Sequence, residues 1–139
     1  MKTTAVRRIL VAVDFSSCSR AALEYACSLA ASLGATLEVL FVHQPEPETE
    51  FGPKESAAAR QELHRFVGTA RCEAPVPVTE RVESGDARDR IVGIAEKDGF
   101  DLIVLGTHGR TGRPRMLAGS VAESVVRTSS RPVLTIRES

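Results

Sequence analysis

The chain has 139 residues, of which 42% are hydrophobic and 26% are charged, and this composition predicts one globular domain over residues 1–139 with a sizeable core. Eighteen basic and eighteen acidic side chains give a net charge of zero, which excludes a general attraction to nucleic acid or to anionic lipid. Any site for an anion must therefore be local.

The three cysteines, Cys18, Cys27 and Cys72, indicate a reducing compartment. Their number is odd and no C-x-x-C pair occurs, which argues against a disulfide framework and against a zinc site. The first apolar run, "ILVAV", ends at Asp14 and is too short for a signal peptide or a membrane span. We therefore expect a cytoplasmic protein without a membrane segment.

The first part of the chain predicts two buried strands with a helix between them. Residues 8–14, "RILVAVD", form a continuous apolar run rich in branched side chains, as in a strand covered on both faces. Ser16 or Ser17 can cap the next helix, and Gly34 stands where a helix-ending glycine is expected. A second strand is predicted over 36–43.

The rest of the chain continues this alternation after a Pro- and Glu-rich connection at 44–56. Apolar spacing and candidate caps predict three further helices, over 56–71, from the cap Asp86 to about Lys97, and over 120–129. They also predict three strands, over 76–84, 100–106 and 131–137. The clear alternation of polar and apolar residues in 76–84 indicates a strand at the edge of the sheet.

Strands that alternate with helices imply parallel pairing and right-handed crossovers, so the sequence predicts an α/β fold with a five-stranded, doubly wound parallel sheet and helices on both faces. Such sheets bind ligands outside the carboxyl ends of the strands, at the point where the strand order reverses. If the first strand lies beside the fourth, the turn after Asp14 and the loop after Gly106 border that point.

The loop "GTHGRTGRPRMLAGS", residues 106–120, has the composition of a phosphate-binding loop. Its glycines allow the main chain to approach an anion, N–H groups at the start of the next helix could donate to it, and Arg110, Arg113 and Arg115 could offset its charge. It is not a Walker P-loop, because no lysine occurs between positions 98 and 139. On composition alone, a flexible connection accounts for it equally well.

The glycine spacing of this loop is similar to that of a known family. Gly106, Gly109, Gly119 and Ser120 match G-x2-G-x9-G-S/T, the nucleotide-loop pattern of the ATP-binding branch of the universal stress protein family. The resemblance continues through "ILVAVDFS", "LFVH", "SGDARDRIVGIAEKDGFDLIVLGTHGRTG" and "GSVAESVVRTSSRPVLTI". It implies an adenine nucleotide alpha-hydrolase-like fold with strand order 3-2-1-4-5.

The resemblance also implies a site for ATP, ADP or AMP between the first and fourth strands. Asp14 would bond the adenosine moiety, Ala12 would line the adenine pocket and Leu105 would flank the nucleoside. Gln44, where family members often have Val, would meet adenine through its backbone. The residues expected around the phosphates are Gly106, Gly109, Gly119, Ser120 and Val121. Magnesium or manganese would be held through the phosphates themselves.

Several of these side chains could instead have structural roles. Asp14 could cap the first helix. His43 ends an apolar strand, where a structural histidine is more common than a catalytic one. His108 could contact a phosphate or act as a general base, although no second catalytic group accompanies it. Pro114 removes one N–H donor from the loop.

Two classes of function therefore stay open. The first is a nucleotide-binding stress or signalling protein with slow or no hydrolysis, at most a weak ATPase, because no dedicated catalytic base is evident. The second is a dimeric interaction module that needs no nucleotide, and the intact glycine loop counts against it. In both cases the short apolar final strand is an exposed edge, and the resemblance implies a homodimer formed through residues 132–136.

Overall fold

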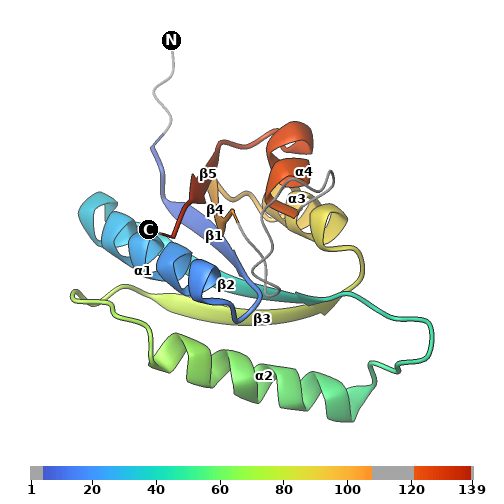
Figure 1. The fold of residues 1–139 in the computed structure, drawn as a ribbon. Coiled ribbons are helices and arrows are strands. Elements are labelled where there is room, and N and C mark those ends of the chain that lie inside the picture. The colour runs from blue at the N-terminus through green and yellow to red at the C-terminus, as the bar shows by residue number, and fades with distance from the viewer. Residues whose placement is uncertain (1–4, 108–120, 139) are drawn as a thin grey trace.

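The computed structural model describes residues 5–107 and 121–138 and contains one five-stranded parallel sheet with helices on both faces (Figure 1). The strand order is β3-β2-β1-β4-β5, and every neighbouring pair runs parallel. The predicted fold class and strand order are confirmed. No helix of the described ranges is long and apolar enough to cross a membrane.

Strands and helices alternate strictly along the described chain. They are β1 (Arg8–Val13), α1 (Ser17–Leu33), β2 (Thr36–His43), α2 (Pro53–Gly68), β3 (Val78–Ser84), α3 (Ala87–Lys97), β4 (Leu102–Gly106), α4 (Val121–Thr128) and β5 (Val133–Ile136). Apart from α2, these bounds lie within two residues of the predicted ones, and both β3 and β5 are edge strands as expected.

The sequence predicts helix α2 over 56–71, which is wrong at both ends. The helix begins at Pro53, because proline fits the first position of a helix and the carboxylate of Glu55 accepts a hydrogen bond from the backbone N–H of Gly52 at 3.0 Å. It ends at Gly68. The Pro- and Glu-rich composition that suggests a connection therefore includes the start signal of the helix.

The helix α1 begins and ends with the predicted signals. Of the two candidate caps, Ser16 is the one used, since its hydroxyl oxygen accepts a hydrogen bond from the N–H of Ser19 at 3.1 Å. Gly34 ends the helix in the left-handed conformation, with φ +67°, and the chain then enters β2.

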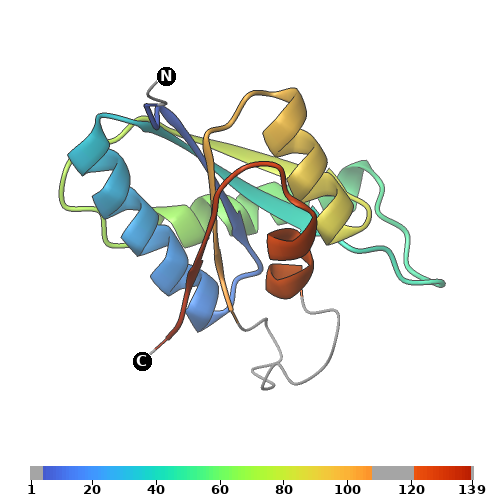
Figure 2. The ribbon, with the colours of Figure 1, turned by 90° about the horizontal axis from the view of Figure 1, so that it is seen from above.

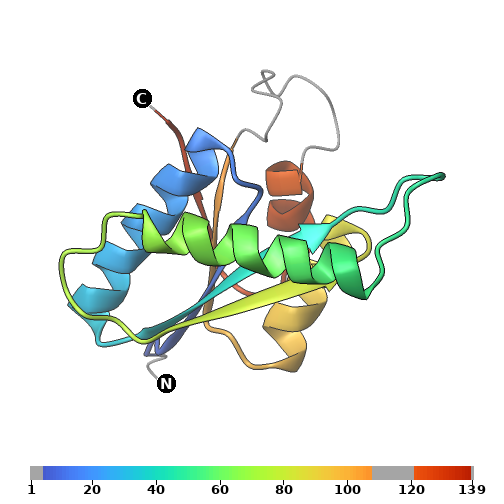
Figure 3. The ribbon, with the colours of Figure 1, turned by 90° about the horizontal axis from the view of Figure 1, so that it is seen from below.

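The two faces of the sheet bury separate apolar clusters. Figures 1 and 3 show α1 and α2 on one face, where Ile9, Val11 and Val13 of β1 pack against them. Figure 2 shows α3 and α4 on the other face, where Leu10 packs. Because β1 leads into α1 on one face and β4 leads into α4 on the opposite face, the neighbouring strands β1 and β4 form the topological switch point of the sheet.

A charged cluster joins the edge strand β3 to the end of α3. The guanidinium of Arg81 donates to Asp98 at 2.6 Å, to Glu83 at 2.8 Å and to Glu38 of β2 at 3.4 Å. These bonds lower the pKa of Glu83 and of Asp98 below their ordinary values, and Arg90 adds to the effect on Glu83. The cluster therefore stabilises the fold only while these carboxyl groups are ionised.

We expect Arg81→Gln to weaken the dependence of stability on acid pH. Because the pKa values of Glu83 and Asp98 are lower in the folded than in the unfolded chain, their contribution is complete above the ordinary values of 4.5 and 3.8 and is lost as the pH falls through the lower folded-state values. Thermal melts from neutral pH down through this window should therefore decline less steeply for Arg81→Gln than for the wild type. Arg88→Gln, which removes an exposed ion pair with Asp89, should keep the wild-type slope, and equal slopes in all three proteins would contradict the assignment.

Candidate functional site

The carboxyl ends of β1 and β4 bring three predicted site residues to one apolar wall. Ala12 of β1 is paired with Leu105 of β4, and this is the last position at which these two strands pair with each other. Both belong to the cluster on the α3–α4 face, where Val121, the first residue of α4, also packs. The structure therefore places Ala12 and Leu105, which the resemblance assigns to the nucleoside, together with Val121, which it assigns to the phosphates.

Asp14 follows β1 directly and its side chain is partly buried. Its Oδ1 accepts hydrogen bonds from the backbone N–H of Ser16 at 3.1 Å and from the hydroxyl of Ser16 at 2.5 Å. Its own N–H donates to Oγ of Ser19 at 3.2 Å. Asp14 is therefore not the helix cap but fixes the hydroxyl that is. Among the described residues, Oδ2 of Asp14 accepts no hydrogen bond, which leaves it able to accept one from a ligand.

The turn after Asp14 requires an uncommon backbone conformation. Phe15 has φ +67°, a region that large side chains rarely adopt. Its ring stacks on that of Phe41, with centroids 4.6 Å apart, and meets the ring of Phe66 edge to face at 5.5 Å. This aromatic contact with the core offsets the strain. As a result the chain turns sharply into α1 and leaves the carboxylate of Asp14 at the edge of the sheet.

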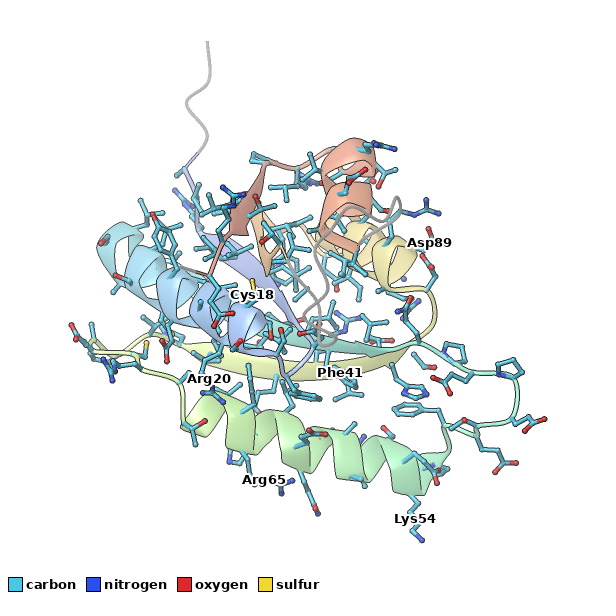
Figure 4. All side chains as sticks on the ribbon, viewed as in Figure 1. Cys18, Arg20, Phe41, Lys54, Arg65 and Asp89 are labelled. Carbon is cyan, nitrogen blue, oxygen red and sulfur yellow. The ribbon has the colours of Figure 1, made fainter. Side chains whose placement is uncertain are left out.

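Gly106 ends β4 at a point of very close contact with α1. A Cβ at this position would lie 2.8 Å from Sγ of Cys18 and 3.0 Å from the backbone carbon and oxygen of the same residue. Figure 4 shows Cys18 at the start of α1, and its thiol donates to the carbonyl of Ile136 at 3.5 Å. Gly106 is therefore required for the packing of β4 against α1, whether or not a ligand binds beside it.

Gln44 and His43 lie at the end of the neighbouring strand β2. The side chain of Gln44 is exposed, and its Oε1 accepts a hydrogen bond from the backbone N–H of Ala87 at 3.4 Å. The ring of His43 stacks on that of Phe51, with centroids 4.3 Å apart, and its carbonyl accepts from the N–H of Gly85 at 2.9 Å. Nε2 of His43 is buried and has no hydrogen-bond partner among the described residues. These contacts favour a structural role for both side chains.

The remaining predicted site residues lie outside the part of the chain that the structure describes: Gly109, Arg110, Gly119, Ser120, His108 and Pro114. Three residues that shape the described edge were missed as site residues. The role of Ser16 could have been predicted, because a serine between a strand and a helix is a capping signal. Its hydroxyl accepts the capping bond from Ser19. The strained conformation of Phe15 and the contact of Cys18 with Gly106 have no signal in the sequence.

A doubly wound parallel sheet with a carboxylate after its first strand and a close-packed glycine after its fourth defines a class of protein. It is the class of α/β proteins that hold small ligands at the switch point between two oppositely wound halves.

Comparisons with known proteins narrow this class. The model of the universal stress protein family matches residues 5–137, and the chain belongs to this family. It is 30% identical over 140 residues to universal stress protein MJ0531 of Methanocaldococcus jannaschii, a match that covers 95% of this chain and 82% of that protein. It is 31% identical over 139 residues to universal stress protein A homolog 1 of Coxiella burnetii, with 94% and 95% covered.

Two solved structures with similar folds contain adenine nucleotides. One is a universal stress protein in complex with cAMP, which has a TM-score of 0.76 and 25% identity and covers 98% of this chain and 100% of that one. The other is the universal stress protein from Archaeoglobus fulgidus in complex with dAMP, with a TM-score of 0.73, 25% identity and coverage of 96% and 99%.

We expect Gly106→Ala to destabilise the protein by about 1–3 kcal/mol, because its Cβ would overlap Cys18 at a contact that involves backbone as well as side chain. Gly93→Ala is the matched control, since a Cβ there meets nothing within 4 Å and alanine in a helix should stabilise by about 0.5–1 kcal/mol. Urea unfolding without any ligand measures both. A Gly106→Ala protein as stable as the wild type would show that the close packing is not required.

Proposed function

We propose that this chain binds an adenine nucleotide at the carboxyl edge of β1, β2 and β4. The observation that carries the proposal is the carboxylate of Asp14, which is fixed through Oδ1 while Oδ2 has no partner among the described residues. It lies at the switch point, next to the end of an apolar wall made by Ala12, Leu105 and Val121. A flat base suits such a wall, and a carboxylate accepts hydrogen bonds from ribose hydroxyls.

The nucleotides in the two solved relatives support this assignment. cAMP carries a ribose and dAMP a deoxyribose, so the chemistry that the two ligands share is the adenine, a pentose ring and one phosphate. In this chain the backbone of Gln44 is left for the adenine, because the side chain is bonded to Ala87. The same adenosine contacts would serve AMP, ADP and ATP.

We assign the phosphates to the loop between β4 and α4. Helix α4 begins at Val121, and the N-terminal end of a helix attracts anions through free N–H groups and its dipole. The glycine spacing of the loop suits backbone donation to phosphate. The residues proposed for this contact are Gly106, Gly109, Arg110, Gly119, Ser120 and Val121.

We infer binding with slow or no hydrolysis, in a cytoplasmic stress-response or signalling role. Asp14, the acid that directly follows β1, is assigned to the ribose, which leaves this edge without a dedicated general base in the proposal. Magnesium or manganese would be coordinated through the phosphates, since the described residues contain no group of three or more His, Cys, Asp and Glu that could hold a metal. The free thiols suit a reducing compartment.

We expect Asp14→Asn to bind AMP and ATP about 10- to 100-fold more weakly than the wild type, because it removes a charged acceptor from the ribose. Asparagine keeps an oxygen for the bonds from Ser16, so the unliganded stability should change little. Calorimetric titration of nucleotide into protein freed of bound ligand, with magnesium present, measures the affinity. Mass spectrometry of the material released by denaturing fresh protein identifies any nucleotide that copurifies.

Two further variants separate the parts of the proposal. Glu96→Gln removes an exposed carboxylate near the far end of α3 and should bind nucleotide as the wild type does. Gly109→Val should fail to bind, and normal binding by this variant would reject the loop assignment alone. If the wild type itself gives no response to ATP, AMP or cAMP, the nucleotide proposal is wrong and an interaction module is favoured.

We also propose a homodimer formed through residues 132–136. β5 is an edge strand in the described sheet, and the carbonyls of Pro132 and Ile136 accept hydrogen bonds from Ile103 and Thr107 on the β4 side. Because backbone groups alternate between the two sides of a strand, the N–H of Thr135 points away from β4. That free edge can pair with a second copy of the chain.

We expect Thr135→Pro to convert the dimer into a monomer, because proline removes the outward N–H without removing a bond to β4. Thr135→Val keeps the N–H and should remain dimeric. Light scattering at micromolar concentration distinguishes the two states. A monomeric wild type, or a dimeric Thr135→Pro protein, would exclude assembly through this edge.

A further inference from the structure

The segment between α2 and β3 is held against α1 by polar contacts. Nη1 of Arg20 donates to Oγ1 of Thr69 at 2.9 Å, and Oε2 of Glu24 accepts from the backbone N–H of Arg71 at 2.8 Å. Figure 4 shows Arg20 on the side of α1 that faces α2, where its guanidinium lies 4.4 Å from the ring centre of Phe66. These contacts fix which residues of the segment lie beside which turn of α1.

Two cysteines lie beside these polar contacts, one turn further along α1. Cys27 follows Glu24 by three residues and so lies on the same face of α1, while Cys72 directly follows Arg71. Both side chains line the same cavity, and the thiol of Cys72 donates to the carbonyl of Ala74 at 3.5 Å. Cys27 is buried, with 4% of its surface exposed, and Cys72 is exposed. One thiol is thus open to small reagents while the other is sheltered.

A cavity of about 240 Å³ adjoins both thiols. Its lining is otherwise mainly apolar and comes from α1, the end of α2, the segment between α2 and β3, and the start of β3, with residues Leu23, Val67, Ala70, Pro75, Val76 and Val78. The cavity has room for the extra oxygen of an oxidised sulfur.

We propose that Cys27 and Cys72 form a reversible disulfide within one chain when the protein meets hydrogen peroxide. The sulfur of Cys72 attacks the O–O bond of the peroxide, which gives a sulfenic acid on Cys72 and one molecule of water. The sulfur of Cys27 then attacks the sulfur of Cys72, forms the S–S bond and releases the hydroxyl group and a proton as a second molecule of water. In total, two thiols are oxidised and one peroxide is reduced.

The order of these steps follows from the surroundings of the two thiols. Burial, and then the neighbouring Cys72 and Glu24, raise the pKa of Cys27 to about 12, so this side chain is a protonated thiol at neutral pH. Thiolates, not thiols, attack peroxide, so the exposed Cys72 reacts first and Cys27 closes the bridge. Closure requires the loss of the Cys27 proton and should be faster at higher pH.

The bridge would link α1 to the segment between α2 and β3 and enclose β2 and α2 in a covalent loop. A cross-link of this kind stabilises a protein mainly by restricting the unfolded chain. It also reinforces the polar contacts of Arg20 and Glu24 with the same segment. Oxidation should therefore lock the α2–β3 segment against α1 without moving the sheet.

The experiment uses the reduced full-length protein without nucleotide, so its outcome does not depend on the proposed nucleotide site. After treatment with hydrogen peroxide, free thiols are alkylated in denaturant and the digest is analysed by mass spectrometry. We expect a linked peptide pair containing Cys27 and Cys72, with Cys18 alkylated. The melting temperature should rise by about 5–10 °C and return to its original value with dithiothreitol.

Three variants make the test specific. Cys18→Ala retains both proposed partners and should still form the bridge. In Cys72→Ser, Cys27 should stay reduced, and the melting temperature of this variant should not change with peroxide. Cys27→Ala should accumulate a sulfenic acid on Cys72 that dimedone traps. The proposal would be overturned by a bridge to Cys18 or by a bridge between two chains. It would also be overturned if Cys27 of the wild type stayed reduced after Cys72 had reacted, or if neither thiol reacted.

Discussion

The close contact between the end of β4 and the first turn of α1 fixes the geometry of the whole carboxyl edge. At Gly106 the backbone approaches Cys18 so closely that a single methyl group would overlap it, with a Cβ only 2.8 Å from the sulfur. The same thiol donates to the carbonyl of Ile136 at the end of β5. One packing contact therefore sets how α1, β4 and β5 meet, and it holds the turn that precedes α1 in place.

That turn presents the carboxylate at the cost of backbone strain at Phe15. The positive φ is maintained because the ring of Phe15 is held between Phe41 and Phe66 in the cluster beneath α1 and α2. The hydrogen bonds from Ser16 then orient Asp14. Core packing on one face of the sheet thus positions a polar group for the ligand edge, which explains how a small domain keeps a rigid site on a short turn.

The sequence predicted those features that depend on local patterns. The apolar runs indicated the strands, and the fold rule for switch points placed the turn after Asp14 and the loop after Gly106 at one edge, while the family resemblance assigned Ala12 and Leu105 to it. Features that depend on contacts between distant residues were not predictable. The strain at Phe15, the fit of Gly106 against Cys18 and the shared cavity of Cys27 and Cys72 arise only when separate helices and strands meet. The error at α2 had a local cause, because a proline was taken as a break rather than a helix start.

The packing requirement at Gly106 limits what its match to the loop pattern says about nucleotide binding. A glycine that packing requires would be retained in a protein of this fold that bound no nucleotide, so its match to the loop pattern is weak evidence for phosphate binding. The evidence from the loop therefore rests on the spacing of Gly109, Gly119 and Ser120, and the evidence from the described residues rests on Asp14. Cys27 lies further along α1 than Cys18, so the proposed oxidation and the proposed nucleotide binding would act on different parts of one helix. Because α1 carries both, any coupling between them would pass through the rigid body of that helix rather than through a shared site.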